Sequence, residues 1–298
     1  MSLQSLEPID TRRLFRPVTR ALVALLRDRP SQDWQRPTIA GAWLVRDVVA
    51  HLLDSTLRRL AFHRDGLPPP PPPRPIASER DFVAFINGLN AEWVAAARRL
   101  SPRILTDLYQ RASDEAADWF EALPLDAPAL FPVSWAGEDA SAGWFDVGRE
   151  FTELWHHQAQ IRLALGAPQL EDPRYLAAVL DVAVRGLPHA FRAVPATPGE
   201  SVSIEIGGPA GGQWTLIRGA SGWTLWQGAR PASDVAAARL RLSDDDAWRL
   251  LFNALPEPET QAALQSRAMI LGRRATGADR GLPAGALGDR LARHFGSP

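Results

Sequence analysis

The hydrophobic pattern of this 298-residue chain changes its period close to residue 196. Before this point, apolar residues recur every three or four positions, as they do on the buried face of an amphipathic helix. Beyond it, they alternate with polar residues between glycine-bearing turns, which is typical of antiparallel strands. The length suits two domains of ordinary size. The sequence therefore predicts a helical domain over residues 1–195 and a small α+β domain with an antiparallel sheet over residues 196–298.

Helical spacing and stop signals divide the first part further. The predicted helices cover residues 10–29, 43–64, 79–123 with a break or a new helix at Pro102, 144–166, and 172–191. The tract at 66–75 holds consecutive prolines, which lack amide donors and favour the extended polyproline conformation. It is interpreted as a stiff connector, and docking into an aromatic groove of a partner is the alternative.

The second part is predicted to hold strands at 201–208, 212–219, 222–228 and 237–243. The glycine-rich turn at 207–212 indicates a hairpin. A helix is expected from Asp244, with the aspartates at its start as N-caps, and another in the tail at 285–296.

Composition excludes several classes of function. Lys and Arg number 33 against 34 Asp and Glu, so the basic footprint of a general nucleic-acid binder is missing. Without a run of about 18 apolar residues or a secretion signal, the sequence predicts a cytoplasmic protein with no membrane partner. The chain has no cysteine, which excludes disulfides, thiolate zinc sites and a catalytic thiol of its own. Any thiol chemistry needs a thiol from outside.

One face of the 144–166 helix carries a polar stripe. Its members, spaced three or four apart, are Asp146, Glu150, Glu153, His157 and Gln160. A solvated face is the usual interpretation of such a stripe. Apolar residues surround this one on both sides, however, which favours a buried helix, and buried charges must be paired or bind a cation. The adjacent His156 is expected on the flank of the stripe.

Three residues of this region could form a metal site. Glu153 and His157 lie four apart and would present an oxygen and a nitrogen ligand from successive turns. His51 lies mid-helix at the border of an apolar arc, where a lone histidine is more often a packing residue than a ligand. Together the three would make a two-histidine, one-carboxylate set on facing helices, which leaves coordination positions open. An open position indicates catalysis or ligand binding.

Two segments resemble a known family. Residues 36–54, with Thr38, Gly41 and Trp43 before His51, and residues 149–166 are similar to the DinB-like, mycothiol-dependent maleylpyruvate isomerase N-terminal family. Residues 222–252 look like the small α+β domain that follows in those enzymes. The resemblance implies a four-helix bundle in which His51, Glu153 and His157 hold a divalent metal, most often zinc, with water or a thiol such as mycothiol at the open position.

The chain departs from this family at one position. Gln160 stands where members carry Asp three residues after the second metal histidine, whereas Arg162 matches. A neutral amide there would alter the hydrogen bonding of a ligand histidine or of the substrate.

Several other side chains are candidates for a role at the site. Arg273 and Arg274 could contact an anionic substrate or thiol across a domain cleft, with surface arginines as the alternative. The tryptophans near the site are interpreted as core packing rather than as substrate platforms: Trp43, Trp135, Trp144 and Trp155. The remaining histidines have no partner at ligand spacing: His63, His189 and His294.

The resemblance and the site residues support three hypotheses. The first is a metal-dependent enzyme, a mycothiol-dependent isomerase or thiol S-transferase, that uses an external thiol on a small electrophile. The second is a non-catalytic protein that binds metal and ligand. The third is a scaffold that no longer binds metal. The expected partners are a small-molecule substrate and a thiol, without nucleic acid or membrane, and a homodimer is left open.

Overall fold

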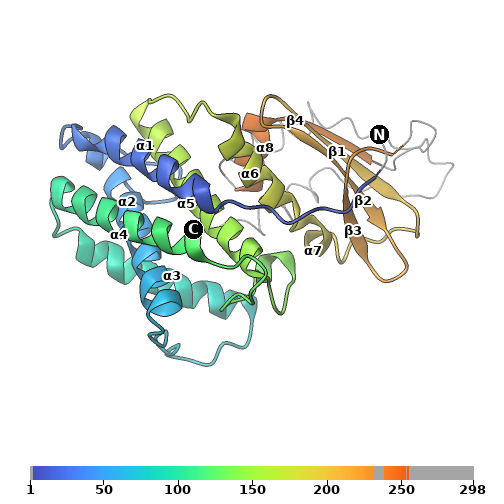
Figure 1. The fold of residues 1–298 in the computed structure, drawn as a ribbon, viewed down its shortest axis with the longest axis horizontal. Coiled ribbons are helices and arrows are strands. Elements are labelled where there is room, and N and C mark those ends of the chain that lie inside the picture. The colour runs from blue at the N-terminus through green and yellow to red at the C-terminus, as the bar shows by residue number, and fades with distance from the viewer. Residues whose placement is uncertain (1–2, 231–237, 253, 255–298) are drawn as a thin grey trace. The chain divides into compact units, whose positions relative to one another are not determined.

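The computed structural model describes residues 3–230, 238–252 and 254 (Figure 1). The chain forms two compact units. The helical unit contains Thr11–Leu130 and Glu153–Glu171, and the mixed unit contains the described residues of Met1–Asp10, Phe131–Thr152 and Asp172–Ser297. One helix, α5, contributes its first half to the mixed unit and its second half to the helical unit. The domain boundary after residue 195 stays a prediction.

The helical unit is built from the segments that the spacing predicted. Its elements are η1 (Arg12–Leu14), α1 (Phe15–Arg27), η2 (Asp33–Gln35), α2 (Val45–Arg58), the π-turn η3 (Arg59–Arg64), α3 (Glu79–Ala97), α4 (Pro102–Ala122) and the second half of α5 (Gly143–Leu165). Helix α2 contacts both α3 and α4, and α1 contacts α4 (Figure 1). The apolar faces of these helices supply most of the buried leucine and valine side chains of the unit.

Local signals fix where these helices begin and end. Ser101 caps α4 by accepting the backbone N–H of Ile104, and Pro102 occupies the first turn, where its missing N–H costs nothing. The predicted break at Pro102 is therefore the start of a new helix. Gly166, with φ of +62°, ends α5 in the left-handed conformation that favours glycine. The proline tract lies between η3 and α3 and forms neither helix nor strand, as expected.

The mixed unit carries a four-stranded sheet in the order β3-β2-β1-β4. Its elements are η4 (Ser134–Ala136), α6 (Pro173–Val184), α7 (Leu187–Ala190), β1 (Ser201–Gly207), β2 (Gly212–Arg218), β3 (Trp223–Gln227), β4 (Ala238–Ser243) and α8 (Asp244–Leu251). The predicted helix at 172–191 is divided between α6 and α7. The fold class, a helical region with a small sheet, is confirmed.

The sheet differs from the prediction in one pairing. The β1–β2 and β2–β3 pairs are antiparallel, with the β1–β2 turn at the expected glycine-rich segment. Strand β4 instead pairs parallel with β1, at the edge opposite β3. Alternation identifies a strand and its buried face but does not identify its neighbour, so the sequence pattern could not reveal this placement.

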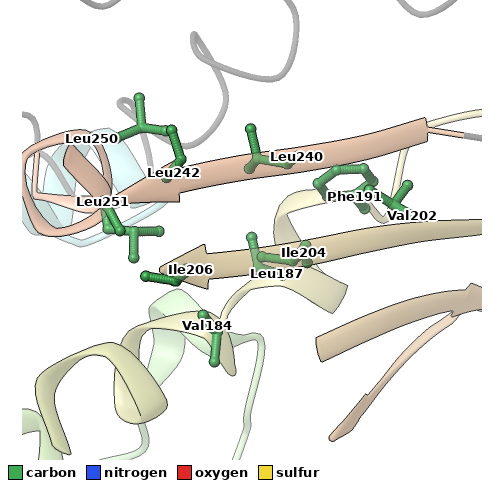
Figure 2. Close-up of a pocket in the computed structure, with 11 residues that line it drawn as sticks. Val184, Leu187, Phe191, Val202, Ile204, Ile206, Leu240, Leu242, Leu250 and Leu251 are labelled. Carbon is green, nitrogen blue, oxygen red and sulfur yellow. The ribbon is translucent and has the colours of Figure 1, made fainter. Parts of the chain in front are cut away.

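The apolar face of the sheet packs on helices of the same unit. A pocket lined only by apolar side chains lies on this face, and Figure 2 shows side chains of β1 and β4 near those of α6, α7 and α8. Its lining includes Val184, Leu187, Phe191, Ile204, Leu240 and Leu251. Alternate residues of each strand point to this face, which is why the period-2 pattern predicted the strands correctly.

The start of α8 corrects a predicted cap. Ser243 Oγ accepts the backbone N–H of Asp246, so Ser243 is the N-cap and the predicted aspartates are not. Asp244, Asp245 and Asp246 lie in the first turn, where negative charge is favoured by the helix dipole. The predicted tail helix at 285–296 lies outside the described residues. Within the described residues, no helix combines the length and hydropathy that crossing a membrane requires.

Candidate metal centre

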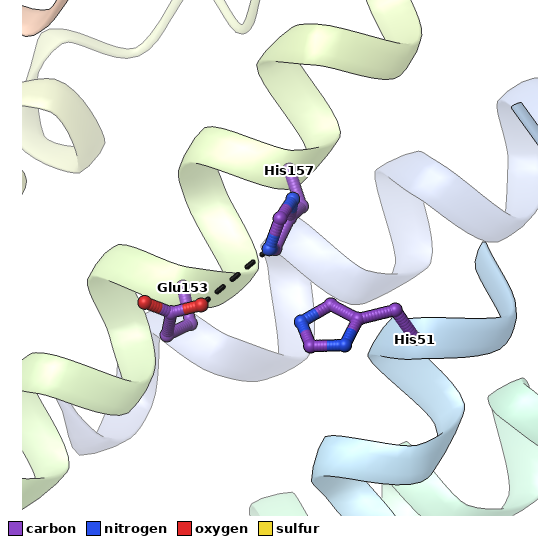
Figure 3. A group of neighbouring side chains, drawn as sticks. All are labelled: His51, Glu153 and His157. Atoms are coloured by element: carbon purple, nitrogen blue, oxygen red, sulfur yellow. Dashed lines mark ion pairs between the residues drawn. The ribbon is translucent and has the colours of Figure 1, made fainter. Parts of the chain in front are cut away.

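Two helices of the helical unit bring His51, Glu153 and His157 together. His51 lies in the middle of α2, while Glu153 and His157 lie one turn apart in the second half of α5. One ligand atom from each side chain lies within 4.8 Å of the other two. Figure 3 shows a ring nitrogen of His51 directed toward the Glu153–His157 pair. The sequence-predicted set therefore meets at one point, and its role as a set of metal ligands stays a prediction.

Hydrogen bonds at the start of α2 fix the position of His51. Asp47 Oδ2 accepts the backbone N–H of Leu44 at 3.1 Å, and both Asp47 oxygens accept from Arg98 at 3.0–3.1 Å. Near the same level, Trp93 Nε1 donates to Ala50 O at 2.9 Å, which ties α3 to α2. These bonds lie within one turn of His51. They hold its helix in place without using the imidazole.

A buried polar pair fixes the rotation of α5. Arg162 donates to Pro168 O at 2.8 Å and to Ala21 O at 3.4 Å. The Gln158 amide, oriented with its nitrogen toward α1, donates to Val18 O at 3.0 Å, and its oxygen accepts from Arg162 at 3.1 Å. Gln158 is fully buried, so these contacts fill hydrogen-bonding capacity that water cannot reach. The helix face that carries Glu153 and His157 is thereby held toward α2.

The two histidines of the site are buried, and the glutamate is partly exposed. His51 is 7% exposed and His157 is 3% exposed, whereas the Glu153 side chain is 35% exposed. Asp146 and Gln160, at the two ends of the predicted stripe, are also buried. The buried interpretation of the stripe is therefore confirmed for Asp146, His157 and Gln160, whereas Glu150 and Glu153 are partly exposed. Solvent reaches the site from the side of Glu153.

Hydrogen bonding determines which nitrogen of His157 is free. His157 Nδ1 lies 2.8 Å from Gln160 Oε1, and because an amide oxygen only accepts, Nδ1 must carry the hydrogen. The lone pair then lies on Nε2, which is buried, has no hydrogen-bond partner, and faces Glu153 Oε2 at 3.4 Å. His51 Nδ1 is also buried without a hydrogen-bond partner. Buried polar atoms without partners next to a carboxylate fit a bound cation.

Electrostatics favour the protonation states that a metal needs. Burial opposes the charge on Glu153, but its electrostatic interactions with His157, His156 and His51 outweigh that cost and hold the pKa of Glu153 below its usual range. Burial, reinforced by the neighbouring His157, lowers the pKa of His51 well below its usual value. An anionic carboxylate and a neutral imidazole at neutral pH are the donor forms that bind divalent ions.

Aromatic rings line the histidine side of the site. The Trp43 ring lies 4.9 Å from the ring of His51 and 6.3 Å from that of His157. Trp43 is half-buried, so it is a wall of the site, and its interpretation as core packing was incomplete. The His156 ring lies 4.0 Å from that of His157, on the flank as expected. Trp43 lies in the turn before α2, outside the helix, so helical residue spacing could not predict its contact with His51.

The remaining candidates lie elsewhere. Trp155 is buried, while Trp135 and Trp144 pack on Phe145 inside the mixed unit at 5.7 and 5.0 Å between rings, as core packing predicts. His63 contacts Arg59 at 3.0 Å, and the ring of His189 lies close to Gly137. Arg273, Arg274 and His294 lie outside the described residues.

The contact between Gln160 and His157 leads to a direct prediction. Replacing Gln160 by methionine, which fills similar space without an acceptor oxygen, is expected to weaken Zn²⁺ binding by about 10-fold, because the imidazole loses the bond that fixes its tautomer. Gln160→Glu retains the acceptor and should bind at least as tightly as the wild type. Competition with a chelating dye measures both affinities. Equal affinities for Gln160→Met and the wild type would show that the amide does not orient the ligand.

Comparisons with known proteins agree with this architecture. A family model described as the mycothiol maleylpyruvate isomerase N-terminal domain matches residues 15–162, which include His51, Glu153 and His157. No curated protein matches the chain. A crystal structure of a histidine-to-alanine mutant of the mycothiol-dependent maleylpyruvate isomerase is 13% identical, with a TM-score of 0.52 over 93% of this chain and 97% of that one. A second structure of that isomerase is 14% identical, with a TM-score of 0.48 over 82% and 88%. At this identity, the first structure shows a shared fold.

Proposed function

We propose that this chain, whose residues 15–162 belong to the mycothiol maleylpyruvate isomerase N-terminal domain family, is an enzyme that uses an external thiol. In this proposal, His51, Glu153 and His157 hold a divalent metal. The observation that carries the proposal is the convergence of three ligand atoms within 4.8 Å, with the buried Nε2 of His157 lacking a hydrogen-bond partner. A small electrophilic molecule is the proposed substrate. The proposed reaction is isomerisation or S-transfer.

The donor set supports zinc as the metal. Imidazole nitrogens and carboxylate oxygens are both ligands that zinc accepts, and three protein ligands leave a position open for an exogenous molecule. When bound, the metal supplies positive charge that favours the thiolate form of a thiol at neutral pH. Because the chain has no cysteine, that thiol must come from outside, and mycothiol is the one that the family suggests. The cytoplasmic location stays a prediction.

The residues around the site would divide the remaining work. The buried rings of His51 and His157 restrict access on one side, so an incoming thiol or substrate would enter beside the partly exposed Glu153. Gln160 holds the Nδ1 proton of His157 and keeps its Nε2 lone pair available. The half-buried Trp43 ring offers an apolar wall beside the histidines, against which an uncharged part of a ligand could pack.

Turnover measurements test the proposal. The protein is stripped with a chelator, reloaded with Zn²⁺, and mixed with mycothiol and a panel of electrophiles that contain cis double bonds or reactive halides. Free thiol is followed over time, and products are followed by NMR. We expect turnover that requires both metal and thiol. Thiol that is regenerated indicates isomerisation, because the thiol adds and leaves again, whereas stoichiometric loss of thiol indicates S-transfer.

Two results would contradict the proposal in different ways. Wild-type protein that binds less than stoichiometric Zn²⁺ would overturn the metal site. Stoichiometric metal without turnover for any thiol and electrophile would instead indicate a protein that binds metal and ligand without catalysis. A parallel reaction with glutathione separates a specific requirement for mycothiol from a general use of thiols.

A further inference from the structure

We propose that residues 67–76 dock, as an extended polyproline helix, in an aromatic-lined groove of a partner protein that also carries an acidic side chain for Arg74. The sequence left such docking as the alternative to a stiff connector. The length of the tract, its exposure and the arrangement of its side chains favour docking. The tract lies outside the candidate metal centre, so this proposal is independent of the proposed function.

The connection that holds the prolines is longer than the fold requires. It covers residues 65–78, between η3 and α3. The helices that it joins are packed in antiparallel directions: Asp47 near the start of α2 pairs with Arg98 at the end of α3, and Arg58 at the end of α2 contacts Asn90. Antiparallel neighbours need a connection of only about 2–8 residues. A spacer therefore does not require six consecutive prolines, which alone extend over about 19 Å.

The tract is anchored at both ends and exposed between them. Leu67 N–H donates to Ala61 O at 2.9 Å, and Ala77 N–H donates to Asp81 Oδ2 at 3.2 Å. Residues 68–76 form a loop between α2 and α3 (Figure 1), and all of them are exposed. Within the described part of the chain, these residues form no hydrogen bond or ion pair. Contacts inside the helical unit therefore do not account for the prolines.

The conformation of the tract gives it a continuous apolar edge. Consecutive prolines favour the polyproline helix, and a residue that precedes proline, such as Leu67 or Arg74, is driven into the same extended region. Three residues make one turn of this helix, so four side chains lie along one edge: Leu67, Pro70, Pro73 and Ile76. Leu67 is 56% exposed and Ile76 is 42% exposed. Aromatic-lined grooves bind such a helix well because it is already formed and loses little entropy on binding.

Arg74 adds a charge to the tract. Its side chain is exposed and, within the described residues, has no ion-pair partner. Arg64, just before the tract, differs because it pairs with Asp65 and Glu115. In the polyproline helix Arg74 lies on the edge next to the apolar one, so a groove with an acidic side chain beside its aromatic rings would contact both edges. Complementary charge of this kind fixes the register in which a ligand binds.

The alternative is that the prolines only stiffen the connector. Stiffness depends on how many prolines the tract holds and not on which edge they occupy, so any two prolines would then be equivalent. Docking predicts instead that Pro70 and Pro73, on the apolar edge, matter more than Pro69 and Pro72, on an edge that faces away from the groove. Replacing either pair by alanine removes the same number of rings from the same tract.

The experiment uses the full chain, and the probe is a purified, ¹⁵N-labelled WW domain with an acidic residue beside its aromatic groove. We expect saturable binding with chemical-shift changes confined to that groove. The variant Pro70→Ala/Pro73→Ala should bind about 10-fold more weakly than Pro69→Ala/Pro72→Ala, since each lost ring removes about two methylene groups from the contact.

The charge is tested by a second pair of variants at low salt. Arg74→Met should bind the WW domain about 5-fold more weakly than the wild type, which is the contribution of one exposed ion pair. Arg80→Met is the matched control, because Arg80 is exposed on α3, outside the tract, and its loss should leave the affinity unchanged.

The outcomes separate docking from stiffness and from the proposed function. Equal affinities of the two double-proline variants, or a wild type without saturable binding, would overturn docking. An Arg74→Met protein that binds as tightly as the wild type would overturn the acidic contact. The substituted side chains are exposed, so circular dichroism should show the same helix content in every variant. Zn²⁺ content, measured in the same samples, should be equal in all of them, so a missing metal would contradict the proposed function without affecting docking.

Discussion

The His51→Ala variant is expected to bind Zn²⁺ more than about 100-fold more weakly than the wild type. The loss of an outer hydrogen bond to a ligand histidine costs about 10–100-fold in metal affinity, and the loss of the ligand itself must cost more. His51 is also the contribution of α2 to the site, so without it the metal would be held by α5 alone. Elemental analysis after dialysis and chelator competition both measure this change.

A second histidine provides the control for this experiment. His63→Gln removes an imidazole that lies near Arg59 and is absent from the His51–Glu153–His157 cluster. Glutamine keeps an acceptor for Arg59, so metal affinity should match that of the wild type. Unchanged metal content in His51→Ala, or equal losses in both variants, would exclude His51 as a ligand.

Leu53→Ala is expected to lower the free energy of unfolding of the helical unit by about 2–5 kcal/mol. Leu53 is 1% exposed on α2, and its truncation removes buried methyl groups and leaves a cavity among packed helices. The unfolding midpoint in urea, followed by the far-ultraviolet circular dichroism of the helices, measures the change.

Leu57→Ala is the matched control, since it is the same substitution one turn later on the same helix. Leu57 is 37% exposed, so less apolar surface returns to water, and the change should stay below about 1 kcal/mol. Similar losses of unfolding free energy in the two variants would contradict the structure, in which Leu53 lies on the buried face of α2 and Leu57 does not. The pair therefore tests the orientation that presents His51 to α5.

Much of the helical unit could be predicted from the sequence because its signals are local. The apolar spacing of α1 and α2, Pro102 in the first turn of α4 and Gly166 after α5 each act within a few residues. The Glu153–His157 pair is equally local, since four residues make one helical turn. These are the parts of the fold and of the site that the sequence predicted correctly.

The rest depends on contacts between distant residues. Pairing of β4 with β1 rather than β3, and the approach of Trp43 to His51, are set by the path of the chain between elements. His51 was a candidate from its place in a helix, but residue spacing alone could not show that it meets Glu153 and His157, which lie on another helix.

The unequal exposure of the three ligand residues has a kinetic consequence. Two rings are enclosed by protein, while the Glu153 side chain is partly exposed. A competing chelator or an incoming thiol would meet Glu153 first, because the two histidine rings are buried. Rates of ion exchange should therefore depend mainly on residue 153, whereas the equilibrium retention of the ion depends on the enclosed imidazoles. The site would be slow to lose its ion and quick to change what else is bound to it.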